Sequence, residues 1–248
     1  MSTSMVSRRL GRRLACHQAL FDPLREPRNR LRWLPELRRW QAARLRAGFA
    51  RFLDDPSRRP AAEFFLTDVY GDHDFSRRDD DIARVLPMMQ RLLPDALLET
   101  VADAIELGAL TQAFDLRMAE RLQAIAPRRR TLDMELYAQV YRECGLPRLR
   151  ARQVALIAEV GSGLAQALRM RGVATLLRLS RVPARTAGLS ELQGFLERGF
   201  DAFAALGDAQ RFIEEIRREE TGFSRRLFAG GAVEPWTPRQ QRRKPPPA

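Results

Sequence analysis

The chain has 248 residues, 45% of them hydrophobic, and a formal net charge of +12, so it can bury a sizeable core and attract acidic partners. Cys16 and Cys144 lie far apart and lack metal-ligand spacing, which is typical of a protein of the reducing cytoplasm. No stretch approaches the ~20 apolar residues that a membrane-spanning helix needs, so we expect no transmembrane segment.

The composition favours helices. Arg, Leu, Ala and Glu dominate, whereas tyrosines are few and β-branched residues are scattered. We therefore expect an all-α fold, a single globular bundle of about eight or nine helices over residues 1–230. Residues 231–248 are rich in proline and arginine and are expected to form a disordered tail.

The charge is segregated along the chain, and Lys244 is the only lysine. Net charges are +10 over residues 1–60, −7 over 61–126, +8 over 127–185 and +1 over 186–248. This order predicts that basic and acidic helices neutralise each other within the fold, and it weakens the case for one continuous basic face.

The N-terminal third predicts two helices. The first, from Val6 to Leu20, carries His17, one of only two histidines. The second runs from Pro35 to about Leu53, with Trp33 and Trp40 flanking it and an apolar face of Leu37, Leu45, Phe49 and Phe52. A core helix whose arginines reach water is the favoured interpretation, and a basic amphipathic helix lying on anionic lipid is the alternative.

The most unusual block spans residues 63–81. A short helix over 61–70 is expected to end at Gly71, and Ser76 with Asp79 forms a capping-box pattern for the next helix. That helix has an apolar stripe of Ile82, Val85, Leu86, Met89, Leu92 and Leu93. We take the candidate functional surface to be Tyr70, Asp74, Arg77, Arg78 and Asp79.

Three interpretations of this block stay open. The weakest interpretation is a metal site with Asp72, His73 and Asp74 as ligands. Neighbouring residues in a loop seldom converge on one ion, so we predict no metal. The second interpretation is an anion pocket formed by Tyr70, Arg77 and Arg78 together with the start of the helix. The third, which we favour, is an aromatic hinge that clamps two helices together, made of Phe64, Phe65, Tyr70 and Phe75.

The same block resembles the signature of an uncharacterised bacterial family of all-helical proteins with an FFLEELY-type motif. The matching residues are Phe64, Phe65, Leu66, Tyr70, Gly71, Asp74, Phe75, Ser76, Arg78 and Asp79. This chain departs from the family pattern at Thr67-Asp68, where members usually have two acids, and at Asp72, where they often have proline. The resemblance implies a helical fold and no particular chemistry.

The middle of the chain predicts three further helical regions. Gly108 is expected to break one helix from the next, and Glu99, Asp103 and Glu106 stand one turn apart without the Glu-x-x-His motif of a di-iron site. A helix over 132–143 follows. The helix over 152–172 is the most apolar and is predicted to be the central member of the bundle. Its Gly161-Ser162-Gly163 run indicates close helix packing. Glu159, as a buried acid, is expected to form an ion pair with Arg152 or with an arginine of a neighbouring helix.

Three helices are predicted in the last part of the chain. The first runs from Val173 to Val182, the second starts at a cap at Thr186 or Ser190 and continues through Phe203, and the third runs from about Ala209 to Phe228.

The sequence favours a non-catalytic role, a cytoplasmic helical protein that binds an unknown protein partner or stabilises an assembly, with no cofactor. It contains no nucleophile–base pair, metal-ligand spacing or nucleotide loop. One alternative is a haem- or metal-dependent oxygenase-like enzyme with His17 as axial ligand. The other is anion or nucleic-acid binding, less favoured, through Arg28, Arg30, Arg32, Arg38 and Arg39, possibly joined by Arg128, Arg129 and Arg130.

Overall fold

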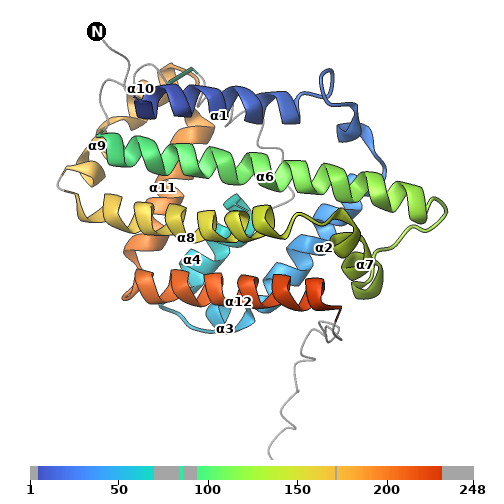
Figure 1. Ribbon diagram of the computed structural model, residues 1–248. Coiled ribbons are helices and arrows are strands. Elements are labelled where there is room, and N and C mark those ends of the chain that lie inside the picture. The colour runs from blue at the N-terminus through green and yellow to red at the C-terminus, as the bar shows by residue number, and fades with distance from the viewer. Residues whose placement is uncertain (1–4, 70–83, 86–93, 171, 231–248) are drawn as a thin grey trace, which may run out of the picture.

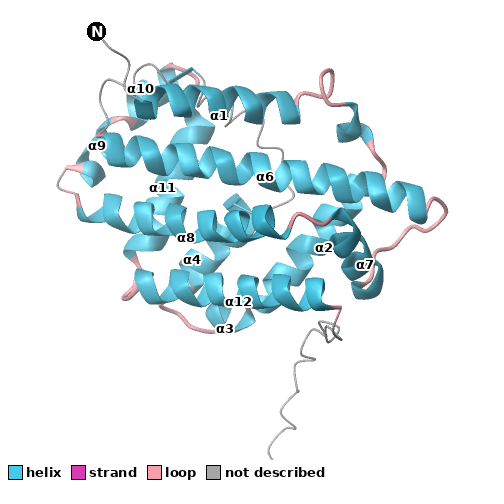
Figure 2. Cartoon of the chain, in the orientation of Figure 1, coloured by secondary structure: helices cyan, strands magenta, loops and turns pink. Residues whose placement is uncertain are grey.

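The protein is built from helices. The computed structural model describes residues 5–69, 84–85, 94–170 and 172–230, and in these ranges it contains eleven α-helices and no β-strand (Figure 1, Figure 2). The helices are α1 Met5–Phe21, α2 Trp33–Gly48, α3 Ala50–Leu53, α4 Arg59–Phe64, α6 Asp95–Ile125, α7 Met134–Cys144, α8 Pro147–Arg169, α9 Val173–Leu179, α10 Arg181–Thr186, α11 Ser190–Ala204 and α12 Ala209–Ala229. A 3-10 turn over Pro27–Arg30 and a π-helical turn over Phe65–Val69 complete the described elements. The predicted all-α fold is confirmed.

The central helix is α6. It lies between α1 and α8 in Figure 1 and buries eleven residues, whereas α8 buries only Arg150, Leu156, Ile157 and Gly161. The prediction that the helix over 152–172 is central was therefore wrong. α8 is less apolar overall than α6, because several arginines interrupt it, and its Val154, Val160 and Leu164 remain half-buried.

Gly108 does not break α6, which runs unbroken for 31 residues. The residue serves close packing: a Cβ atom at position 108 would lie 2.9 Å from Nε2 of His17 on α1. Real Cβ atoms do not approach so closely, so glycine lets α1 seat its histidine against α6. The predicted break was wrong because a helix tolerates one glycine at a cost of only about 1 kcal/mol.

The second predicted helix is a core helix. Its predicted apolar face is buried, at 0–6% exposure for Leu37, Leu45, Phe49 and Phe52. Trp33 is 2% exposed, and the ring of Trp40 stacks on Tyr137 with centroids 4.1 Å apart. These tryptophans therefore face the protein interior, which overturns the alternative that they lie on lipid. The helix also breaks after Gly48 and resumes as α3.

The small residues of α8 let three helices approach each other. A Cβ at Gly161 would lie 2.9 Å from Cγ1 of Ile213 on α12, and one at Gly163 would lie 2.2 Å from Oγ1 of Thr100 on α6. This confirms that the Gly161-Ser162-Gly163 run permits close helix packing.

The expected helix over 173–182 is two helices, α9 and α10. Neither Thr186 nor Ser190 caps α11: the Thr186 hydroxyl donates to carbonyl oxygens within α10, and α11 begins at Ser190 without a side-chain cap. The final helix, α12, matches its predicted bounds closely, with Phe212, Ile216 and Leu227 buried.

Candidate functional site

The predicted functional surface of Tyr70, Asp74, Arg77, Arg78 and Asp79 lies outside the described residues, as do the alternative metal ligands and the expected tail. Of the predicted aromatic hinge, Phe64 and Phe65 are described and are 5% exposed. Phe64 packs on Phe195 with ring centroids 5.4 Å apart, and Phe65 packs on Phe203 at 5.9 Å. Both aromatic rings therefore fasten the end of α4 to α11.

The predicted arginine face does not form one continuous basic surface. Arg28 pairs with Glu26 and lies 3.3 Å from Glu120, while Arg38 hydrogen-bonds Gln112 and its Nε lies 3.7 Å from Asp115. Glu120 and Asp115 belong to the acidic middle segment, so basic and acidic helices neutralise each other as the charge order predicts.

The remaining predicted arginines have separate environments. Arg32 donates to the carbonyl oxygen of Pro127 at 2.7 Å, Arg39 pairs with Glu36, and Arg30 is exposed. The run over 128–130 is an exposed loop in which Arg129 pairs with Asp133.

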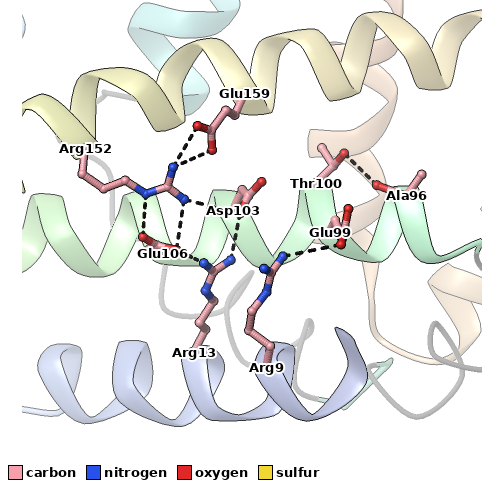
Figure 3. Close-up of polar contacts among 9 residues, drawn as sticks. All are labelled: Arg9, Arg13, Ala96, Glu99, Thr100, Asp103, Glu106, Arg152 and Glu159. Atoms are coloured by element: carbon pink, nitrogen blue, oxygen red, sulfur yellow. Dashed lines mark hydrogen bonds and ion pairs between the residues drawn. The ribbon is translucent and has the colours of Figure 1, made fainter. Parts of the chain in front are cut away.

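The predicted carboxylates of α6 form an ion-pair network with arginines of α1 and α8. Arg13 of α1 donates to Asp103 at 2.8 Å and also pairs with Glu106 (Figure 3). From the other side Arg152 of α8 donates to Glu106 at 3.0 Å (Figure 3). The side chains of Arg13, Asp103 and Glu106 are only 19–22% exposed, so this network joins three helices across partly buried surface.

Glu159 is less buried than its place on α8 predicts, with a side chain that is 43% exposed. Arg152 donates to both of its carboxylate oxygens at 2.8 Å, which confirms the predicted ion pair. The carboxylates that resemble a metal-ligand series thus face guanidinium groups.

His17 is a core residue. It is 6% exposed, its ring stacks on Phe21 with centroids 4.5 Å apart, and its Nε2 edge faces Gly108. A haem iron would need room next to a ring nitrogen, about 2 Å away along its lone pair. The close approach of α6 to Nε2 gives the haem hypothesis no geometric support on that side.

A second polar cluster lies in the interior between α2, α6 and α8. Asp115 of α6 is 5% exposed and accepts a hydrogen bond from Gln41 Nε2 at 3.1 Å. Burial raises the pKa of the Asp115 carboxyl, and the nearby Arg38 and Arg150 only partly offset this. Burial dominates because Arg38 is 3.7 Å away and also hydrogen-bonds Gln112.

Arg150 of α8 is equally buried, at 5% exposure. Its Cζ atom lies 3.6 Å from the ring centroid of Phe114 and 4.4 Å from that of Tyr141. Its guanidinium donates to Gln153 Oε1 and to the sulfur of Met118, each at 3.1 Å. Stacking on aromatic rings replaces part of the hydration that this cation loses.

A surface of a different kind lies on α9 and α10, which we call the α9–α10 face. Its apolar members are Leu176, Leu179 and Val182, which are 55%, 71% and 69% exposed. Its basic members are Arg178, Arg181 and Arg185, all exposed. The two helices lie at one end of the molecule, at the left of Figure 1.

Local sequence explains why these apolar side chains point outward. The inward stripe of the two helices comprises Val173, Leu177, Ser180 and Ala184, at helical spacing. Leu176, Leu179 and Val182 fall outside this stripe and are exposed. Glycines in the left-handed conformation, Gly172 at φ +89° and Gly188 at φ +70°, bracket the pair of helices and reverse the chain at each end.

The α9–α10 face is fixed by contacts between α9, α10 and α11. Gln193 of α11 is 9% exposed, donates to the carbonyl oxygen of Leu177 at 2.8 Å and accepts from Ser180 Oγ at 3.1 Å. Arg181 pairs with Glu197 at 2.6 Å. These contacts fix the orientation in which the leucines project.

Part of the positive charge of the face is offset by Glu197 of α11, which pairs with Arg181 and also attracts Arg185. Among the described residues, no carboxylate lies within ion-pair distance of Arg178 or Arg185. Residues 160–190 contain five arginines and no acid. Sequence reasoning predicted only one short helix over 173–182 and assigned no role to it, although the acid-free run is a signal that points to this face.

The fold and these surfaces define an all-α protein whose polar clusters stabilise helix packing and whose α9–α10 face combines exposed aliphatic and basic side chains. A family model described as "Domain of unknown function (DUF8198)" matches residues 20–234, and the chain therefore belongs to this family. A search of curated proteins and a search of solved structures each gave no match. No described helix is long and apolar enough to cross a membrane.

Proposed function

We propose that this chain is a non-catalytic helical binding module of the cytoplasm that docks on a negatively charged partner through the α9–α10 face. The observation that carries the proposal is the exposure of Leu176, Leu179 and Val182, at 55–71%, beside Arg178 and Arg185. Large aliphatic side chains that project together from consecutive turns mark interaction sites, and neighbouring cations without carboxylate partners select negative charge.

The other clusters support a role without chemistry. In the three-helix network and around Asp115, arginines and carboxylates contact each other or core side chains, so these charges hold helices together.

Site-specific photocrosslinking tests the proposal. A photoreactive residue is placed at Leu179 of the full chain in living cells, and a matched chain carries it at Leu24, which is 84% exposed and outside the face. We expect adducts, with protein or with lipid, from position 179 only, and their loss when Arg178→Gln and Arg185→Gln are combined. Equal adducts from both positions, or none from position 179, would refute the proposal.

A further inference from the structure

We propose that the partner of the α9–α10 face is the surface of an anionic lipid bilayer, an inference that rests on the function proposed above. The face has the composition of an interfacial surface, with aliphatic side chains that can enter the headgroup boundary and arginines that can contact lipid phosphates. Residues 160–190 contain no acidic side chain, and Glu197 beside the face is paired with Arg181, so repulsion between carboxylates and anionic lipid is small there.

The exposure of the leucines argues for a bilayer over a protein groove. A side chain that is 71% exposed, as Leu179 is, projects from the surface with open space around it. A bilayer accepts such a projection without a complementary pocket, whereas a protein partner must supply a groove of matching shape.

Nucleic acid fits the face less well. Residues 173–187 contain no aromatic side chain for stacking on bases and no Asn or Gln for reading base edges. The exposed aliphatic side chains between the arginines would also remain unburied against a phosphate backbone.

The start of the N-terminal helix is also basic and carries an exposed apolar residue. α1 begins at the same end of the molecule in Figure 1. Its first residue, Met5, is 79% exposed, and Arg8 and Arg12 on its outer side are exposed, with no carboxylate of the described residues in ion-pair distance.

The test is binding of the purified full chain to vesicles of phosphatidylcholine that contain about one-third phosphatidylglycerol, compared with pure phosphatidylcholine. We expect sedimentation with the anionic vesicles only. Each arginine near the surface contributes about a factor of five, so Arg178→Gln with Arg185→Gln should weaken binding about 30-fold. The matched control is Arg30→Gln with Arg46→Gln, which removes equal charge from exposed arginines elsewhere and should weaken binding less than about three-fold.

A fluorescent reporter distinguishes insertion of this face from general adsorption. An environment-sensitive dye is attached at Leu179→Cys in a chain that also carries Cys16→Ala, because Cys16 is exposed and Cys144 is buried. We expect a blue shift at position 179 with anionic vesicles and none at Leu24→Cys. Unchanged circular dichroism and urea midpoints confirm that these exposed substitutions leave the fold intact.

Several results would overturn the bilayer inference. One is vesicle binding without a blue shift of the dye at position 179. Another is equal weakening of vesicle binding by the two pairs of arginine substitutions. A third is dimerisation that depends on protein concentration and is abolished by Leu179→Glu, because it would show that the face binds a second copy of the chain. Protein adducts in the crosslinking experiment together with no vesicle binding would refute the bilayer and leave the proposed function standing. No adducts and no vesicle binding would refute both.

Discussion

Arg13 Nη1 lies 2.8 Å from Asp103 Oδ1, which fastens α1 to α6 on the side where Arg152 of α8 also meets the carboxylates of α6 (Figure 3). The preceding residue, Arg12, is exposed to solvent. Adjacent arginines in one helix thus have different environments, because successive residues point about 100° apart.

This pair of arginines offers a matched test of the network. Arg13→Gln should lower the free energy of unfolding by about 1–2 kcal/mol, since its two ion pairs are partly buried and its removal leaves Asp103 with only the more distant Arg152, at 3.9 Å. Arg12→Gln should change it by less than about 0.5 kcal/mol. Urea unfolding at low and high salt measures both, and equal effects would contradict the assigned role of Arg13.

Two mid-helix glycines should respond in opposite directions to alanine. Gly11→Ala on α1 should stabilise the protein by about 0.5–1 kcal/mol, because open space surrounds the new methyl group. Gly108→Ala should destabilise it by about 1–2 kcal/mol, because the methyl group would overlap the ring of His17.

The control for Gly108→Ala is the double variant with His17→Ala. Removal of the ring creates room, so the double variant should lose less stability than the sum of the two single variants. Additive losses in urea unfolding would show that the contact between His17 and Gly108 does not limit the packing of α1.

Asp115→Asn should change how stability depends on pH. Burial raises the pKa of Asp115 above 3.8 in the folded protein, so the unfolded chain ionises first as pH rises. The wild-type protein therefore loses stability relative to the variant by up to about 1.4 kcal/mol for each pH unit between 3.8 and the folded pKa. Above that window the difference becomes constant.

Urea unfolding of both proteins from pH 3.5 to pH 8 measures this difference. A difference that stays flat across the range, or that favours the wild-type protein increasingly as pH rises, would mean that Arg38 and Arg150 outweigh burial. Asp55→Asn, at an exposed carboxylate that accepts hydrogen bonds from Ser57, is a control of opposite sign, because those bonds lower the pKa of Asp55.

Arg150→Lys should be more harmful than Arg150→Met. Lysine keeps a buried charge but lacks the planar group that stacks on Phe114 and Tyr141, so a loss of about 2–4 kcal/mol is expected. Methionine leaves no buried cation and should cost less. Arg148→Lys, at an exposed position on the same helix, should change the free energy of unfolding by less than about 0.5 kcal/mol. If Arg150→Lys matched wild type in urea unfolding, stacking would not contribute.

The sequence predicted the individual helices better than it predicted which helices pack against each other. The apolar face of α2 and the inward residues of α12 followed from 3.6-residue periodicity, because one apolar stripe must face the core whatever lies opposite. The break at Gly108 and the central place of α8 were wrong, because both depend on what packs against the helix. The predicted surface from Tyr70 to Asp79 stays a prediction.

By itself the sequence determined that this protein is helical and that its basic and acidic segments would pair, because propensity, periodicity and charge order are properties of the chain. Only the tertiary structure decided that Arg13 faces carboxylates while Arg178 faces solvent, and that Leu179 projects while Leu156 is buried. The physical reason is that burial and ion pairing are set by the position of the neighbouring helix, which residues far away in the sequence provide.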